Sequence, residues 1–245
     1  MIVLHDYQLI FLKAAKVAGT SFEIALSRYA HERDIITPIV PKDEEIRAKL
    51  NFRGPQNYEH SIFSLIRNPS RRSVHQLMRG RWPALYWNHI DAARTKAQLG
   101  KSTWDRYLKV AIVRDPWDRL VSRYFFNNPG AKCCLDNFTS WAFSNSTLLE
   151  ENYAQYMIEG EVIIDLFIRF ERFQEDIERL ELIRDSLSGL FQTFSTIRAK
   201  SNFRPKKEIA VRDIFHSAPA VDKLVREKNA FEIEKFGYDI EEDNA

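Results

Sequence analysis

The sequence predicts an α/β fold in which a central parallel β-sheet is flanked by helices on both sides. Three short apolar runs, residues 9–12, 110–113 and 163–170, are each followed by a stretch with helical spacing. Strands that alternate with helices favour a parallel sheet, because the connecting helices pack on its two faces. One or two further strands are expected in the less regular parts. The 245 residues, 44% of them hydrophobic, fit one domain over 1–245.

The first apolar run leads through a tight turn into a helix that starts near Phe22. The turn carries Lys16, Gly19, Thr20 and Ser21. The first backbone N–H groups of a helix and the positive end of its dipole attract anions, and Lys16 adds a full charge. The spacing is not that of the nucleotide-binding P-loop. The turn therefore predicts a phosphate site, and the alternative is a helix start that needs Ser or Thr only as a cap.

The region before the second strand is less regular. Residues 34–40 are apolar but contain Pro38, which indicates an edge or irregular segment, and Pro41 opens a charged helix that runs to Leu50. Residues 51–58 form a loop. Residues 67–81 hold five arginines, His75 and no acid. This basic stretch fits either a groove for a negatively charged acceptor or a solvated surface.

An aromatic segment, residues 82–91, contains His89 near its end. A helix is expected over 92–99, because Gly100 stops it. A short helix follows, for which Ser102 or Thr103 is the expected cap.

The second informative stretch begins with the buried strand 110–113. Arg114 follows at its carboxyl end, where open α/β sheets bind ligands. Asp115 can cap the next helix, and Pro116 suits its first position. Arg114 and Ser122 are therefore candidates to hold a second phosphate, the arginine in bidentate fashion. The alternative is that Arg114 is a salt-bridge partner.

The remaining elements are expected as follows. Helices are predicted over 138–143 and 151–158, a strand over 163–170 and an amphipathic helix over 173–187. A basic segment, residues 198–207, precedes a charged terminal helix over 218–236.

Composition excludes several classes of protein. A net charge of +2 argues against a general nucleic-acid coat. Cys133 and Cys134 are adjacent, so a structural disulfide is not expected and a reducing compartment is the default. No ligand spacing for zinc occurs in the sequence, so a metal site is not expected either. The first residues do not have the pattern of a signal peptide, and no apolar run reaches the length of a membrane span, so we expect neither. We expect a soluble, cytoplasmic protein.

Two motifs resemble those of a known family. Residues 16–21 (Lys-Val-Ala-Gly-Thr-Ser) resemble the 5′-phosphosulfate-binding loop of sulfotransferases, and residues 114–122 resemble their 3′-phosphate motif, R-x-P-x-x-R-x-x-S. The match is nearest to the branch of carbohydrate and heparan sulfate 2-O-sulfotransferases, with its small bacterial relatives. Residues 88–90 are similar to the segment that carries the catalytic histidine in the 2-O-sulfotransferase members. Residues 167–171 are similar to the third strand of the family, and residues 200–204 to its late basic segment near the nucleotide. The resemblance extends over residues 8–238 and implies a P-loop-like sheet.

The chain departs from the family pattern in places. Ala15 stands where the family usually has proline, and Ala18-Gly19 where it often has Gly-Gly. Arg67 begins a second R-x-P-x-x-R match, but its serine position is His75 and no comparable helix follows. The 3′-phosphate motif is therefore assigned to Arg114 and not to Arg67.

The resemblance implies the donor 3′-phosphoadenosine 5′-phosphosulfate (PAPS) and the product 3′-phosphoadenosine 5′-phosphate (PAP). The sulfuryl group passes to a hydroxyl, less often an amine, of a carbohydrate or glycan-like acceptor. Lys16 is implied as the catalytic lysine and His89 as the base, with His60 and His75 as alternatives. The residues implied to bind the donor are Lys16, Val17, Ala18, Gly19, Thr20, Ser21, Arg114, Ser122, Lys200, Ser201 and Arg204. No metal is required.

Two other functions stay open. A nucleotide-dependent kinase needs an acidic residue at a strand end to hold magnesium, and Glu171 is the candidate. A non-catalytic module for anionic glycans would use residues 67–81 and the late basic segment. The identity of the acceptor stays open, and the terminal helix is compatible with a homodimer.

Overall fold

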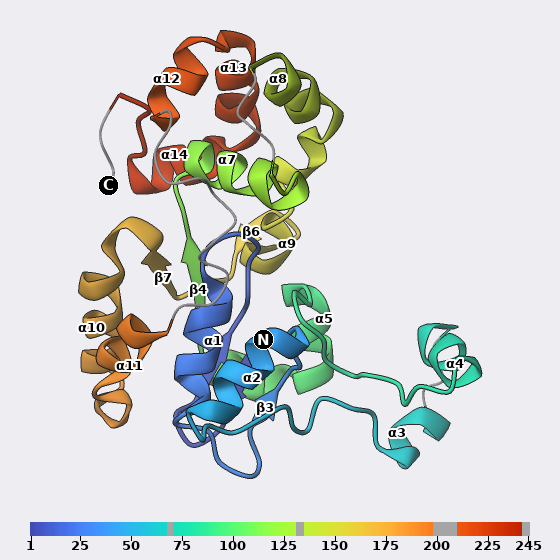
Figure 1. The fold of residues 1–245 in the computed structure, drawn as a ribbon. Helices are drawn as coiled ribbons and strands as arrows, with labels where there is room; N and C mark the ends of the chain where they lie inside the picture. The colour runs from blue at the N-terminus through green and yellow to red at the C-terminus, as the bar shows by residue number, and fades with distance from the viewer. Residues whose placement is uncertain (68–70, 131–134, 198–209, 242–245) are drawn as a thin grey trace.

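The computed structural model describes residues 1–67, 71–130, 135–197 and 210–241. A five-stranded sheet in the order β3-β1-β2-β4-β7 lies at its centre (Figure 1). β2 (Leu9–Phe11), β4 (Leu108–Val113) and β7 (Leu166–Arg169) run parallel, with Leu9 opposite Leu108 and Val110 opposite Leu166. These three are the predicted strands.

β1 (Ile2–Leu4) and β3 (Ile35–Ile36) complete the sheet on its other side. β1 pairs antiparallel with both β2 and β3, so the sheet is mixed although its middle is parallel. β3 is an edge strand, as Pro38 had suggested. β1 and β3 are therefore the one or two further strands that were expected in the less regular parts of the sequence.

Helices pack on the sheet, and a second group of helices lies beyond one end of it. α1 (Gly19–Ser27) packs against α2 (Pro41–Lys49) and α11 (Leu190–Thr196), and α11 packs against α10 (Phe173–Ile183). α5 (Ala92–Leu99) and α6 (Lys101–Arg106) precede β4. Beyond the carboxyl end of β4 lies a second group of helices, drawn at the top of Figure 1: α7 (Pro116–Asn127), α8 (Leu135–Ser144), α12 (Val211–His216), α13 (Pro219–Lys228) and α14 (Ala230–Phe236).

The buried apolar residues form two clusters. One surrounds the sheet and includes Phe11, Phe22 and Ile112. The other lies among the second group of helices and includes Trp117 and Phe138. Phe167 of β7 packs against both clusters and so joins them.

Some predicted helices differ from those observed. Gly100 is the N-cap of α6, so Ser102 and Thr103 lie inside the helix and do not cap it. The helix expected over 151–158 is only α9 (Tyr153–Tyr156), and a hairpin of β5 (Met157–Ile158) and β6 (Glu161–Val162) follows. Its turn residues, Glu159 and Gly160, both have positive φ, as a two-residue hairpin turn requires.

Two further boundaries were wrong. The helix expected over 173–187 ends at Ile183, and a short 3-10 turn follows (Asp185–Leu187). The terminal helix expected over 218–236 is two helices, α13 and α14. Asn229 separates them, because its buried side chain donates a hydrogen bond to the Leu149 carbonyl (2.8 Å).

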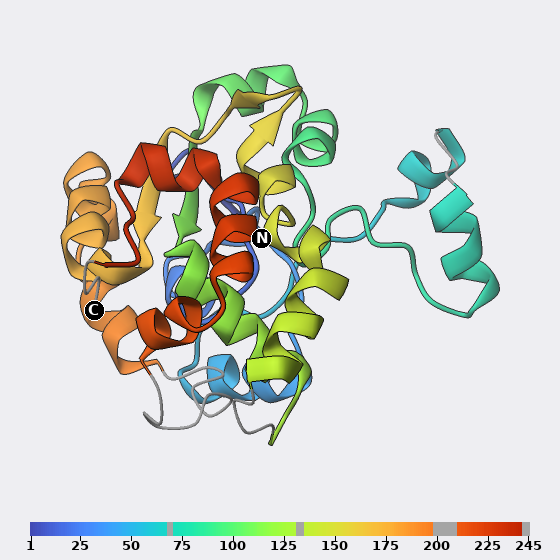
Figure 2. The same ribbon diagram turned by 90° about the horizontal axis from the view of Figure 1, so that it is seen from above.

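A helical arm projects from the body of the protein. It consists of α3 (Ile62–Arg67) and α4 (Arg71–Met78) and lies apart from the other helices in two perpendicular views (Figures 1 and 2). Apolar side chains on it face solvent, among them Phe63, 84% exposed, and Met78, 82% exposed. Most of the basic stretch 67–81 lies on this arm.

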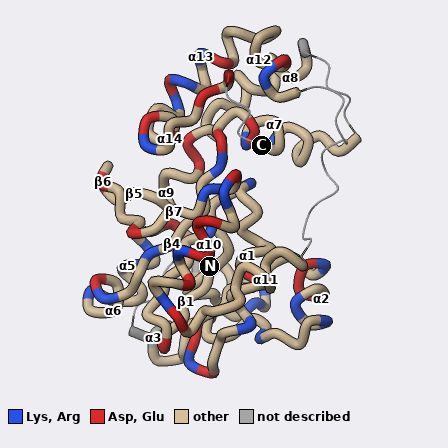
Figure 3. The backbone as a smooth tube through the Cα atoms, turned by 90° about the vertical axis from the view of Figure 1, so that its left-hand side faces the viewer, with Lys and Arg blue, Asp and Glu red and all other residues tan. Residues whose placement is uncertain are grey.

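Over the rest of the described chain, basic and acidic residues are interspersed along the helices (Figure 3). Within the described residues, no helix combines the length and the apolar character that crossing a membrane requires.

Candidate functional site

The turn between β2 and α1 has an unusual backbone. Lys16 and Ala18 both have left-handed φ values, 61° and 59°, and Ala18 is the N-cap of α1. This conformation costs an L-residue roughly 1–2 kcal/mol relative to a right-handed one. Glycine adopts it without that cost, which gives a physical reason for the Gly-Gly pair often found in the resembling loops.

The start of α1 excludes the simple capping alternative. Ala18 has no polar side chain, so it makes no side-chain cap. Thr20 and Ser21 lie within the first turn of the helix and are buried, 6% and 5% exposed. Gly19 permits a close approach, because a Cβ there would lie 3.0 Å from Cγ of Lys13. α1 therefore begins without a side-chain cap at its N-cap residue.

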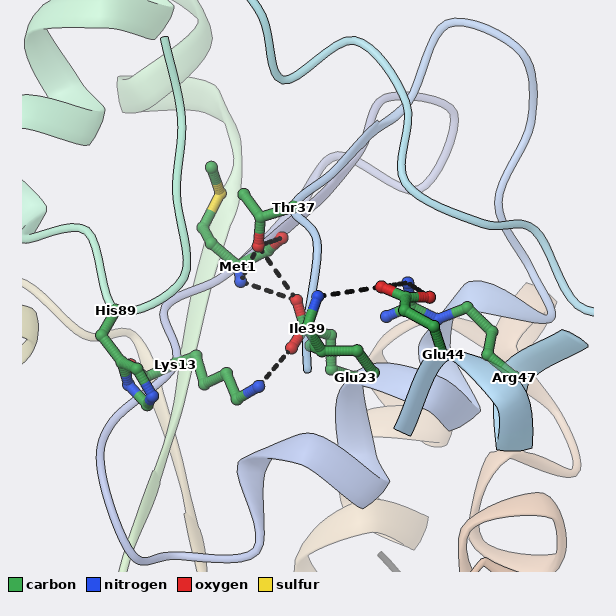
Figure 4. A network of polar contacts seen from close by, with 8 residues as sticks. All are labelled: Met1, Lys13, Glu23, Thr37, Ile39, Glu44, Arg47 and His89. Carbon is green, nitrogen blue, oxygen red and sulfur yellow. Dashed lines mark hydrogen bonds and ion pairs between the residues drawn. The ribbon is translucent and has the colours of Figure 1, made fainter. Parts of the chain in front are cut away.

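The two lysines of the turn have different surroundings. Lys13 is 2% exposed and its ammonium lies 2.6 Å from a carboxylate oxygen of Glu23, which is fully buried (Figure 4). Burial alone would raise the pKa of Glu23, but the charges of Lys13 and of the Met1 ammonium lower it to about 2. Lys16 is half-buried, and its Nζ lies 4.0 Å from the ring centroid of Phe126 on α7. Lys16 is thus the lysine with access to a ligand.

Arg114 connects the second motif to this turn. Its Nη1 donates a hydrogen bond to the Lys16 carbonyl (3.0 Å), and its Nε and Nη2 contact Oδ2 of Asp118 at 2.7 and 2.5 Å. The guanidinium also stacks on Phe170, 4.0 Å from the ring centroid. A guanidinium has five N–H donors, and these contacts use three of them. Arg114 is therefore a salt-bridge partner, as the alternative stated, and also a bridge between the motifs.

The turn after β4 has the predicted cap. The Asp115 side chain accepts hydrogen bonds from the backbone N–H groups of Trp117 and Asp118 (2.8 and 3.0 Å), and Pro116 is the first residue of α7. Ser122 lies on α7 and is half-buried. Within the described structure, no hydrogen bond joins Ser122 to Arg114.

His89 lies beside the same turn from a third segment (Figure 4). Its Nδ1 lies 3.0 Å from the Lys13 carbonyl. A carbonyl can only accept, so Nδ1 carries the proton and Nε2 of the neutral ring carries a lone pair. His89 is exposed, yet desolvation of its ring and the charge of Lys13 lower its pKa to about 4. At neutral pH the imidazole is uncharged and able to accept a proton at Nε2.

The alternative histidines lie elsewhere. His75 is on α4 of the arm and is exposed. His60 precedes the arm, where its backbone N–H and carbonyl bond to Pro83 and to the Trp82 indole. Of the three, His89 is the one with a hydrogen bond to the Lys16 turn.

Several predicted residues fall outside the description. Lys200, Ser201 and Arg204 are not among the described residues, nor is the side chain of Arg67. The pattern also gave no reason to select Phe126 and Phe170, which contact the two cations. Their only signal was their place in the sequence, since Phe126 lies near the end of α7 and Phe170 directly follows β7.

Glu171 does not have the environment of a magnesium ligand. One of its oxygens accepts a hydrogen bond from the Asp115 N–H (2.7 Å) and the other from the Tyr238 hydroxyl (3.0 Å). Burial raises the pKa of this carboxyl. Among the described residues, no group of three or more His, Cys, Asp or Glu side chains is arranged to hold a metal ion.

A comparison with known protein families found a match over most of the chain. A family model described as "Sulfotransferase family" matches residues 1–239. An uncharacterized protein of Archaeoglobus fulgidus is 30% identical over 86 residues, which are 34% of this chain and 72% of that protein. No solved structure matches the chain.

Proposed function

Since the chain belongs to the sulfotransferase family, we propose that it transfers a sulfuryl group from PAPS to a hydroxyl, less often an amine, of a carbohydrate or glycan-like acceptor and releases PAP. The hydrogen bond from Arg114 to the Lys16 carbonyl carries the proposal. It joins two phosphate-type motifs that are 98 residues apart in sequence. A ligand with phosphate groups at both ends suits a site built from both motifs.

The residues of the turn fit the 5′ end of such a donor. The first turn of α1 supplies backbone N–H groups and the positive end of a helix dipole. Lys16 supplies a positive charge on a left-handed backbone, and Gly19 lets the turn pack closely on Lys13. We assign Val17, Ala18, Gly19, Thr20 and Ser21 to the 5′-phosphosulfate and Arg114 and Ser122 to the 3′-phosphate. For Lys200, Ser201 and Arg204 the assignment rests on the resemblance alone.

Each catalytic residue has one task in this scheme. PAPS supplies an activated sulfuryl group and a good leaving group. Nε2 of His89 takes the proton of the acceptor hydroxyl as its oxygen bonds to sulfur. The Lys16 ammonium stabilises the negative charge that develops on the oxygen leaving sulfur. The bridge from Arg114 holds the Lys16 carbonyl while this charge develops.

Ligand binding is the first test. PAP at 100 times its dissociation constant should stabilise the protein by about 2.7 kcal/mol, which a thermal-shift assay resolves easily. ATP with Mg²⁺ should stabilise it much less. Stabilisation by ATP–Mg²⁺ and not by PAP would replace the proposal with the kinase alternative.

Turnover is the second test. Lys16→Ala should reduce turnover by about two to four powers of ten with the fold intact, if Lys16 stabilises charge in the transition state. Lys223→Ala, at a lysine whose side chain is 79% exposed, is the matched control and should retain activity. Wild-type turnover in Lys16→Ala would remove Lys16 from the mechanism.

The 3′ site is tested at two positions. Ser122→Ala should weaken PAP binding roughly tenfold to a hundredfold, the effect of losing a hydrogen bond to a charged group. Arg114→Ala should weaken it more, because it also removes the contact with the Lys16 carbonyl. An unchanged dissociation constant in both variants would move the 3′ site elsewhere.

A non-catalytic module for anionic glycans is the second candidate, and the arm favours it. Arg71, Arg79 and Arg81 are exposed on or beside α4. This function requires salt-dependent polysaccharide binding without nucleotide. PAP binding that Arg114→Ala abolishes would count against it.

A further inference from the structure

We propose that Asn152 and Gln155, at the two ends of one helical turn, are positioning residues that hold the Lys16 turn and His89 in a fixed relation. The inference rests on the proposed function, because that function assigns the two residues being positioned. Three side chains of the α9 segment carry it, and they bond to Ala15, to His89 and to strand β4.

Asn152 holds the residue before Lys16. Its side chain is fully buried, its Oδ1 accepts a hydrogen bond from the Ala15 N–H (2.7 Å), and its Nδ2 donates one to the Ala15 carbonyl (3.1 Å). One amide therefore fixes the two peptide groups on either side of Ala15, in the manner of a paired strand. This restraint is applied directly before the left-handed Lys16.

The identity of residue 15 makes this contact specific. Proline has no backbone N–H, so a proline at position 15 could not donate to Asn152. It would instead restrict the backbone through its own ring. In this chain, Asn152 restrains the backbone at position 15 through hydrogen bonds, where a proline would restrain it through its ring.

Gln155 holds His89. Its side chain is 5% exposed, and its Nε2 donates a hydrogen bond to the His89 carbonyl (3.1 Å). His89 has a left-handed φ of 57°, which a non-glycine residue keeps only when its surroundings restrain it. The Lys13 carbonyl restrains the ring and Gln155 restrains the backbone.

The α9 segment is itself anchored to the sheet and to α7. The Tyr156 hydroxyl donates a hydrogen bond to the Ile112 carbonyl of β4 (2.7 Å), and Tyr156 is fully buried. Upstream, the Leu149 carbonyl accepts from Nη2 of Arg119 (2.7 Å). Because the α9 segment is fixed at both ends, it holds the Lys16 turn and His89 at defined positions relative to β4. A misplacement of about 1 Å at reacting groups can cost a hundredfold in rate, so such a frame affects catalysis.

The test separates positioning from simple loss of stability. Asn152→Ala and Gln155→Leu are compared with wild type well below their melting temperatures, by PAP affinity and by PAP formed from PAPS with desulfated heparin as acceptor. Asn145→Ala is the matched control, since Asn145 donates a similar hydrogen bond, to the Trp141 carbonyl, away from the turn.

The two variants should differ in a defined way. Gln155→Leu should lower kcat about tenfold to a hundredfold and leave PAP affinity within about threefold, because it releases only His89. Asn152→Ala should lower kcat and also weaken PAP, and hydrogen exchange at the Ala15 amide should accelerate. Addition of Ala15→Pro to Asn152→Ala should recover at least part of both losses, whereas Ala15→Pro in the wild type should reduce activity.

The outcomes are distinct. Wild-type kcat and PAP affinity in both variants, with only a lower melting temperature as in the control, would overturn the inference. A loss in Asn152→Ala that Ala15→Pro does not reverse would overturn the assignment of Asn152. A wild-type protein that neither binds PAP nor forms it would instead overturn the proposed function, and the exchange of the Ala15 amide would still report on Asn152.

Discussion

Glu23→Gln is the change that most directly tests how the Lys16 turn is held to α1. Glu23 and Lys13 are almost completely buried and their charged atoms lie 2.6 Å apart. With an effective dielectric constant of about 20, the Coulomb attraction at this distance is roughly 6 kcal/mol, most of which offsets the dehydration of the two charges. Removal of one partner leaves a buried charge uncompensated and costs about 3–5 kcal/mol.

This loss corresponds to a fall in melting temperature of roughly 6–20 °C for a chain of this size. Glu227→Gln is the matched control, since Glu227 and Lys223 form an exposed pair with charged atoms 3.8 Å apart, and it should shift stability by less than about 0.5 kcal/mol. Chemical denaturation at pH 7 measures both variants. A loss below about 1 kcal/mol in Glu23→Gln would refute the reasoning.

The pH dependence gives a second measurement on the same variant. The pKa of Glu23 is lowered to about 2, so its contribution to stability is complete above pH 4.5 and is lost as the pH falls toward 2. Glu23→Gln should therefore remove part of the acid sensitivity of the wild type. An identical fall in stability between pH 4.5 and pH 2 in both proteins would contradict the assigned charge pair.

Three other predictions follow from the site and the arm. The acid limb of kcat/KM should fall near pH 4 and not near 6.5, because His89 must be neutral to act and its pKa is lowered to about 4; a limb near 6.5 would exclude His89 as the base. Ala18→Gly should raise stability by about 1 kcal/mol, since it relieves a left-handed alanine, and a lower melting temperature would contradict this. Phe63→Ser should change the free energy of unfolding by no more than about 0.5 kcal/mol, because Phe63 is 84% exposed; a larger loss would mean that the arm packs on the body.

The strand–turn–helix units were the predictable part of the fold. Their apolar runs are continuous, and Asp115-Pro116 is a strong helix start, so both β4 and α7 were expected where they occur. The position of β1 was not expected, because it is set by antiparallel pairing with both β2 and β3, which no local pattern encodes. The helix break at Asn229 was missed for a similar reason, since it depends on a hydrogen bond to the distant Leu149 carbonyl.

The site was predictable only as separate pieces. The motifs selected Lys16 and Arg114, but the bond between them is tertiary and no spacing encodes it. The role of Lys13 was not expected, because a lysine next to a buried strand gives no sign of its carboxylate partner on the following helix. Asn152 and Gln155 were missed because single amides in a short helix have no sequence signature.

The order of the parallel strands also has a consequence for folding kinetics. β4 and β7 are joined by roughly 55 residues, whereas β2 and β4 are joined by roughly 100, so the closure entropy favours the first pairing by about 0.5 kcal/mol. The β4–β7 pairing therefore has the lower closure cost of the two parallel pairings, and the Lys16 turn, which follows β2, depends on the more costly one.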